Sequence, residues 1–175
     1  MSEIRYNKAM RKFLRQASSF IAPVLVCIVL PCFLIAHRHA RTGSPILPSL
    51  GLAVLGGIIG IIGTVFALLS FRLVIKIGNG TIMPWDPTKK LVVVGLYGFV
   101  RNPMILSILV ILLGEAVAFA SDAVLILAAA FFIINTLYFR FSEEPGLEKR
   151  FGEEYLEYKR NVPRWMPRVT PWRPR

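Results

Sequence analysis

Two short stretches of the sequence combine residue types that could hold a polar ligand. In the first, Arg101-Asn102-Pro103 opens a long apolar run, and Tyr97 lies just before it. Asparagine followed by proline is a common helix start, with asparagine as N-cap and proline in the first helical position. The same start presents free backbone N–H groups and the positive end of the helix dipole, which bind carboxylates and phosphates. The stretch therefore indicates either a simple helix start or an anion site.

The second stretch is Glu143-Glu144, directly after another apolar run. A surface helix with a solvated acidic face explains it, because six of the ten acidic residues fall between Glu143 and Glu157. Ionisable groups beside hydrocarbon are costly unless paired, and Arg140 lies within helical reach of both glutamates. Alternatively, a carboxylate here pairs with the ammonium of a ligand. With the anion site around Asn102, it would then complete a site for an amino-acid-like molecule.

The segments that must position these stretches are apolar enough to cross a membrane. The chain of 175 residues is 55% hydrophobic, and its mean hydropathy of +0.59 is typical of membrane proteins. Spanning helices need about 20 apolar residues. Four runs with few or no charges meet or approach this length: Gln16–Ala36, Thr42–Phe71, Pro103–Ser121 and Ala123–Phe139. We therefore expect an all-α, multi-pass membrane protein of about four spans, with a single domain over residues 1–175.

The basic residues orient these spans. Lysine and arginine gather before the first run, between the second and third, and after the fourth, so that only Arg38 and Arg41 fall elsewhere. By the positive-inside rule both termini and the 72–101 loop face the cytoplasm. Residues 3–15 are typical of a basic amphipathic helix on the membrane surface, and the residues after the last span are expected to form a cytoplasmic helical tail. Both candidate stretches then lie on the same side of the membrane.

The net charge of +11 does not indicate nucleic-acid binding, because the basic residues flank membrane segments and form no recognition motif. Membrane lipids with anionic headgroups are the expected partners. Cys27 and Cys32 lie inside the first run and are expected to be buried thiols. His37 and His39 lie on an outer loop without acidic or cysteine companions. We therefore expect no metal site.

Three blocks of the sequence together resemble the isoprenylcysteine carboxyl methyltransferases. They are LVVVGLYGFVRNPM from Leu91 to Met104, the pair Glu143-Glu144, and FGEEYLEYKRNVPRWMPR from Phe151 to Arg168. The same blocks look like the wider group that contains the phospholipid N-methyltransferases. The resemblance covers about residues 78–168, and the order and spacing of the blocks carry it.

The resemblance implies an integral membrane enzyme that uses S-adenosyl-L-methionine. The cofactor would lie between the loop before the third apolar run and the glutamates after the fourth. Arg140 lies close to the family's substrate-side arginine, and Glu144 or Glu143 would accept the proton of an amine acceptor, so Arg140 and Glu144 are the candidate catalytic residues. The residues implied around the cofactor are Lys89, Leu91, Val92, Tyr97, Arg101, Asn102, Pro103, Met104, Ile105 and Glu143.

Two positions depart from the family's R-H-P-x-Y motif, since its histidine is Asn102 here and its tyrosine is Ile105. Asparagine forms hydrogen bonds in place of a neutral imidazole but does not titrate near neutrality. We expect methyl transfer to a lipidic or membrane-partitioned acceptor. A carboxylate or thiol acceptor is favoured over an amine, which must first lose a proton. A non-catalytic membrane scaffold and a sterol reductase-like enzyme that uses NADPH are the alternatives.

The charge distribution predicts that both termini lie in the cytoplasm. Cysteines placed at Ser2 and Thr170, in a chain whose Cys27 and Cys32 are replaced by serine, should not react with a membrane-impermeant thiol reagent added to intact cells. Reaction after permeabilisation serves as the positive control. Labelling of either position in intact cells would contradict the four-span arrangement.

Overall fold

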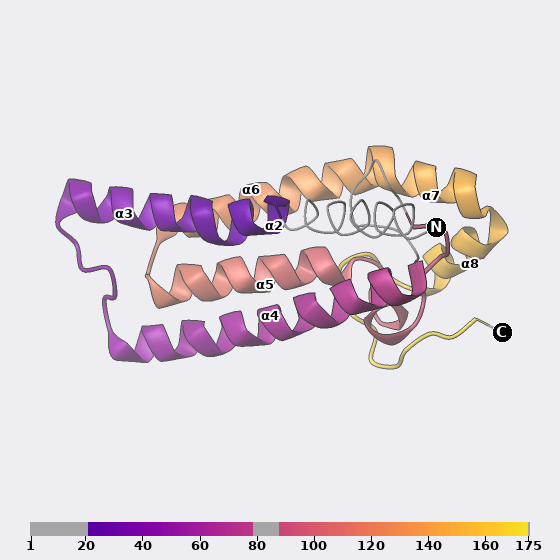
Figure 1. The fold of residues 1–175 in the computed structure, drawn as a ribbon, viewed down its shortest axis with the longest axis horizontal. Helices are drawn as coiled ribbons and strands as arrows, with labels where there is room; N and C mark the ends of the chain where they lie inside the picture. Colours follow the sequence, from indigo (N-terminus) through magenta and orange to yellow (C-terminus); the bar gives the residue numbers. More distant parts are fainter. Residues whose placement is uncertain (1–20, 79–87, 175) are drawn as a thin grey trace, which may run out of the picture.

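The computed structural model describes residues 21–78 and 88–174, and the elements in these residues are all helical. Four helical columns lie roughly along one axis, and consecutive columns run in opposite directions (Figure 1). In chain order the elements are α2 (Ile21–Val24), η1 (Leu25–Val29), α3 (Leu30–Thr42), α4 (Leu50–Gly78), η2 (Gly95–Gly98), α5 (Pro103–Ala118), α6 (Asp122–Tyr138), η3 (Phe139–Glu143), α7 (Glu144–Phe151) and α8 (Glu153–Asn161). Of these, η1 and η3 are π-helical turns inside longer helices, and η2 is a 3₁₀ turn.

Three of the four columns are long and apolar enough to cross a membrane: Ile21–Thr42, Leu50–Gly78 and Asp122–Phe151. The fourth column is α5, whose 16 residues extend over about 24 Å at ~1.5 Å per residue. This is shorter than the ~30 Å hydrocarbon core of a bilayer, but α5 packs between α4 and α6. The structure confirms the predicted all-α membrane fold. The number of spans and their orientation stay predictions.

Several helix boundaries differ from those predicted from the apolar runs: α3 continues past Ala36 to Thr42, and α4 continues past Phe71 to Gly78. The second run was predicted to begin at Thr42, but Gly43 ends α3 in the left-handed conformation with φ 66°, and α4 begins only at Leu50. The fourth run was predicted to end at Phe139, but the helix continues to Phe151. A run without charges shows that a segment is apolar, but it does not show where a helix begins or ends. The pattern therefore predicted neither the helix end at Gly43 nor the continuation of the last helix to Phe151. The predicted N-terminal surface helix lies outside the described residues.

Glycines bring α4 and α5 into backbone contact. A Cβ on Gly56 would collide with the Gly114 carbonyl and with Ala118, and one on Gly114 would lie 2.6 Å from the Gly60 nitrogen. Gly63 is equally tight, because its Cβ would lie 2.8 Å from a side-chain carbon of Ile111. Close approach through small residues is how membrane helices gain packing energy without a hydrophobic driving force. This interface fixes α5, from Ser107 to Ala118, against α4.

At the end of the bundle that carries the 43–49 connection, Arg38 fastens α3 to the turn after α5. Its guanidinium donates to the carbonyls of Ala120 at 2.6 Å and Phe119 at 2.9 Å. A cation at a helix C-terminus satisfies carbonyls that have no helical partner and faces the negative end of the dipole. The Ser121 side chain then accepts from the Val124 N–H and caps α6. The α5–α6 turn is therefore held by Arg38 of α3 and by the Ser121 cap of α6.

At the opposite end, the C-terminal tail folds back over the loop that precedes α5 (Figure 1). Three backbone N–H···O=C hydrogen bonds join them, each of 2.9 Å: Arg101 to Pro163, Arg168 to Phe99, and Trp172 to Gly98. A hydrophobic cluster lies beneath these bonds and consists of Val93, Tyr155, Tyr158 and Val162, with Leu91, Leu147, Phe151 and Trp172 packed against it. The loop before α5 is thus held by the tail as well as by its own helix.

The glycine interface predicts an asymmetry between two adjacent positions of α4. Gly56→Leu should destabilise the protein by at least the ~1–3 kcal/mol typical of overpacking, because the side chain has no space against α5. Gly57→Leu is the matched control, since a Cβ there meets nothing within 4 Å. Thermal unfolding in detergent, followed by circular dichroism, measures the difference. Equal melting temperatures for the two variants would contradict the interface.

Candidate active site

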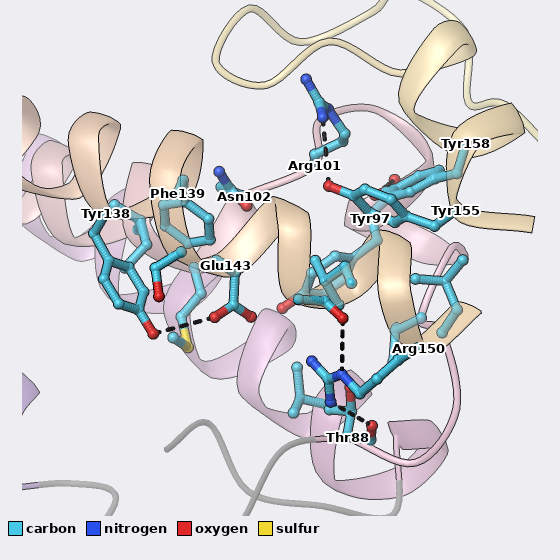
Figure 2. Close-up of a pocket in the computed structure, with 18 of the residues that line it drawn as sticks. Thr88, Tyr97, Arg101, Asn102, Tyr138, Phe139, Glu143, Arg150, Tyr155 and Tyr158 are labelled. Atoms are coloured by element: carbon cyan, nitrogen blue, oxygen red, sulfur yellow. Dashed lines mark hydrogen bonds between the residues drawn. The ribbon is translucent and has the colours of Figure 1, made fainter. Parts of the chain in front are cut away.

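A cavity of about 540 Å³ lies where the loop before α5, the start of α5 and the α6–α7 column meet (Figure 2). Its volume lies in the range of ~300–1,000 Å³ that small-molecule sites occupy. Eight of the predicted residues line it: Leu91, Val92, Tyr97, Arg101, Asn102, Met104, Ile105 and Glu143. The two stretches singled out by their chemistry are therefore brought to one site.

Asn102 occupies the N-cap position of α5, but its side chain makes no capping hydrogen bond. Its backbone carbonyl accepts from the Leu106 N–H at 3.1 Å, so the helix begins without help from the amide. The side-chain Nδ2 is buried and has no hydrogen-bond partner in the described part of the chain. A buried unpaired donor costs about 1–3 kcal/mol. Asn102 lines the cavity, and no hydrogen bond in the described part of the chain holds its amide nitrogen away from a ligand.

The first turn of α5 adds backbone donors to the same wall. Pro103 has no N–H, and the N–H groups in the first turn of a helix lack partners within the helix. Met104 and Ile105 both line the cavity beside Asn102. Together with the positive end of the α5 dipole, these groups favour a negatively charged ligand group.

Glu143 and Glu144 point to different places although they are adjacent. Successive side chains of a helix are separated by about 100° around its axis, so one residue can face the cavity while the next faces away. Glu143 ends the π-helical turn η3 and lines the cavity, where it accepts a 3.2 Å hydrogen bond from the Tyr138 hydroxyl. Glu143 thus supplies the cavity with a carboxylate.

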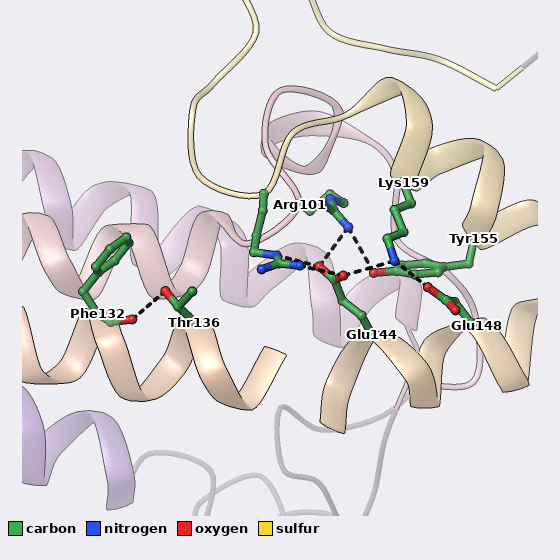
Figure 3. A network of polar contacts seen from close by, with 8 residues as sticks. Arg101, Phe132, Thr136, Glu144, Glu148, Tyr155 and Lys159 are labelled. Atoms are coloured by element: carbon green, nitrogen blue, oxygen red, sulfur yellow. Dashed lines mark hydrogen bonds and ion pairs between the residues drawn. The ribbon is translucent and has the colours of Figure 1, made fainter. Parts of the chain in front are cut away.

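Glu144 begins α7 and is 3% exposed, inside a network of cations (Figure 3). Its Oε1 accepts from Arg101 Nη1 at 2.9 Å and from Arg164 Nε at 2.7 Å. Its Oε2 accepts from Arg164 Nη2 at 2.8 Å and lies 3.4 Å from Lys159 Nζ. Both carboxylate oxygens are engaged, and Glu144 does not line the cavity. These contacts indicate that Glu144 holds the loop and the tail together, and they do not favour its predicted role as a proton acceptor.

Comparison with known proteins identifies the family. A model of the phospholipid methyltransferase family matches residues 52–154, which is more than half of the chain. The chain belongs to the phospholipid methyltransferase family. Searches of curated proteins and of solved structures found no match. The match confirms the resemblance found in the sequence, to the group of membrane methyltransferases that includes this family.

The residues matched to the phospholipid methyltransferase family extend from α4 into the first turn of α8. They include the start of α5 with Asn102 and the η3 turn with Glu143. The match begins earlier than the predicted range of 78–168 and ends before the tail. Tyr155, Tyr158 and Arg164, which complete the surroundings of the site, therefore lie beyond the matched residues.

Three of the remaining predicted residues lie apart from the cavity. Lys89 is exposed, and its backbone N–H donates to the Gly78 carbonyl at 2.8 Å. Arg140 is exposed, with its guanidinium carbon 5.7 Å from the centre of the Phe141 ring. The predicted pairing of Arg140 with the glutamates is wrong, because Glu143 and Glu144 have the other partners described above. Pro103 is buried at the start of α5 and is not a lining residue. Whether these residues act in catalysis stays a prediction.

Several lining residues were missed in the sequence. Arg150 lines the cavity and donates to the Thr88 carbonyl at 3.2 Å, so a second arginine lies here where Arg140 was expected. The α6–η3 column contributes aromatic and small polar side chains, and α8 contributes two tyrosines: Asn135, Tyr138, Phe139, Ser142, Tyr155 and Tyr158. The spacing of three in Tyr155 and Tyr158 places them on one helix face. That spacing was the available signal for α8.

Three tyrosines that line the cavity, Tyr97 in the loop before α5 and Tyr155 and Tyr158 in α8, remain protonated at neutral pH. Burial raises the pKa of Tyr97 and of Tyr158 well above the ordinary value for tyrosine. Burial also raises the pKa of Tyr155 to about 12. The Tyr158 hydroxyl donates to the Tyr97 carbonyl at 2.7 Å. These side chains therefore shape the cavity and donate hydrogen bonds, and they are poorly suited to accept a proton.

Asn102 provides a test that separates a cap from a ligand contact. Because its side chain caps nothing, replacing Asn102 should leave the helix start intact. The negative charge of Asn102→Asp should repel the carboxylate of S-adenosylhomocysteine and weaken its binding by about tenfold or more, the value of one charged hydrogen bond. Asn102→Ser should have a smaller effect, and Asn102→His should preserve or improve affinity. Calorimetric affinity is measured beside thermal stability. If the Asp variant binds as well as the wild type, Asn102 does not contact the ligand and serves only as the residue before the helix.

Proposed function

We propose that the protein is an S-adenosyl-L-methionine-dependent methyltransferase of the membrane that acts on a lipidic or membrane-partitioned acceptor. One observation carries the proposal. The buried, unpaired amide of Asn102 and the carboxylate of Glu143 face the same cavity in a chain of the phospholipid methyltransferase family. A donor and a negative charge at one site suit a ligand that carries both a carboxylate and an ammonium group.

The chain's residues fit the polar groups of this cofactor. Asn102 Nδ2 and the backbone N–H groups of Met104 and Ile105 would receive its carboxylate, and Glu143 would receive its ammonium in a charge-assisted hydrogen bond. The aromatic side chains Tyr97 and Phe139 offer ring faces to the adenosine and to the positive sulfonium. When bound, the cofactor supplies an electrophilic methyl group.

The protein's own contribution to such a reaction is positioning. Methyl transfer is an in-line displacement, so the side chains must hold the acceptor atom behind the methyl group, and the gain comes from orientation. Leu91, Val92 and Ile105 give the cavity apolar walls that exclude water. The loop that carries the first two is held by the tail through the cluster around Val93. The walls are therefore preorganised by contacts outside the cavity.

The acceptor is proposed to reach the cavity from the bilayer and to carry a carboxylate or thiol. Asn135, Tyr138 and Phe139 line the cavity from inside the helix Asp122–Phe151, which is long and apolar enough to span a membrane. Arg150 is exposed at the cavity, and its Nη2 has no partner in the described residues. A guanidinium in that place favours an anionic acceptor. A carboxylate needs no proton acceptor, which agrees with the engagement of both Glu144 oxygens.

Calorimetry in detergent tests the cofactor and the role of Glu143 together. S-adenosylmethionine and S-adenosylhomocysteine should both bind the wild-type protein. Glu143→Gln should weaken binding by about 1.5–3 kcal/mol, the value of a hydrogen bond to a charged group, which is roughly one to two decades in affinity. Glu157→Gln, on an exposed position of α8, is the matched control.

Each outcome of this titration has a distinct meaning. No heat with either ligand would remove the proposal, and heat with NADPH instead would favour a reductase. Normal binding by Glu143→Gln would leave the proposed methyltransferase function in place but would show that Glu143 does not bind the ammonium group. Mass spectrometry of lipids and thiols after incubation with a labelled methyl donor then identifies the acceptor.

A further inference from the structure

The segment Arg164–Arg168, here named the tail tip, packs against the side of an apolar helix. The Trp165 ring lies 5.1 Å from the Phe132 ring and 6.2 Å from the Phe139 ring, measured between centroids. Both phenylalanines belong to the column Asp122–Phe151, which is apolar enough to cross a membrane. The tail tip therefore lies beside a membrane helix and not out in the solvent beyond its end.

The helix itself gives the depth of this contact. Phe132 lies ten residues after Asp122, where the helix begins, which is about 15 Å along the axis at ~1.5 Å per residue. Phe139 lies about 26 Å along by the same rise. A hydrocarbon core about 30 Å thick that begins near Asp122 would include both rings. Trp165, which contacts both, then lies between the middle of the core and the boundary that is farther from Asp122.

The residue after Trp165 presents apolar surface at this level. Met166 is 77% exposed, although a thioether side chain is ordinarily buried in a protein interior. Phe132, beside the tail tip, is also exposed, as are Ile133 and Leu137 on the same helix. Met166 therefore presents apolar surface directly after Trp165, which packs against the column Asp122–Phe151.

Both ends of the tail tip are fastened to the protein. Arg164 makes a bidentate pair with Glu144, at 2.7 and 2.8 Å. The Arg168 N–H donates to the Phe99 carbonyl at 2.9 Å, and its guanidinium donates to the Asn161 carbonyl. The backbone on both sides of Met166 is therefore held in place, and these contacts keep the Met166 side chain exposed.

We propose that the tail tip is a re-entrant membrane contact, in which Met166 enters the bilayer at the boundary between headgroups and acyl chains. The occupant of its exposed surface is lipid, because Met166 directly follows Trp165, which packs against a helix long and apolar enough to cross a membrane. This inference depends on the position of the Asp122–Phe151 column in the membrane and not on the proposed methyltransferase activity.

Spin labelling in lipid nanodiscs tests the proposal. Met166→Cys is labelled in a chain whose Cys27 and Cys32 are replaced by serine, and its collision rates with oxygen and with a water-soluble nickel chelate are compared. Two matched positions calibrate the scale: Ile126→Cys on a lipid-facing part of α6, 68% exposed, and Glu153→Cys on α8, whose side chain is 86% exposed. The label at Met166 should favour oxygen over nickel, as at Ile126.

Two results would overturn the proposal. Nickel accessibility at Met166 equal to that at Glu153 would place the tail tip in water. Dipolar coupling between labels on two chains, with little access for either reagent, would make the surface a contact between copies. Thermal unfolding of each variant verifies that it is folded.

A measurement without new cysteines complements the labels. Lipids brominated near the headgroup end of their chains should quench the part of the tryptophan fluorescence that Trp165→Phe removes. Quenching of that part by no more than a water-soluble quencher achieves would also reject the proposal.

Discussion

The arrangement of the site depends on one buried carboxylate. Glu144 holds Arg101 from the loop before α5 and both Lys159 and Arg164 from the tail, and its own backbone continues directly from Glu143. Removing one partner of a buried ion pair costs about 3–5 kcal/mol, because the remaining charge is left without compensation. Three segments that are distant in the sequence are therefore tied to one another. The two walls that carry Asn102 and Glu143 are placed by this network.

The membrane part of the fold depends on a different kind of contact. Between α4 and α5 the packing uses glycines, because lipid offers no hydrophobic drive for helices to associate. The glycine interface fixes the middle and the end of α5 against α4, while the backbone bond from Arg101 to Pro163 ties the residue just before the start of α5 to the tail. The glycine contacts thus hold the body of α5, while the ionic network and the tail hold the loop that leads into Asn102.

Much of the fold could be predicted because apolarity and charge are local properties of the chain. Helical columns, the family and the meeting of the 101–104 and 143–144 stretches all follow from composition, order and spacing. The partners of Glu144 could not be predicted, since Arg140 lies within helical reach while Arg164 is brought in only by the fold of the tail. For the same reason Arg150 was missed in favour of Arg140. The unpaired amide of Asn102 also required the structure, because sequence alone fits a capping asparagine equally well.

The π-helical turn η3 sets the directions in which Glu143 and Glu144 face. Such a turn accommodates one residue more than an α-helix in the same rise, and Glu143 is its last residue. If Phe139–Glu143 closed as an ordinary α-helix with all of its residues kept, everything after this segment would rotate by about 100°. The carboxylate that faces the cavity and the one that holds the tail would then both leave their partners. A substitution that shifts this segment from a π-helical to an α-helical turn would therefore disturb both the cavity and the tail, although neither carboxylate is itself changed.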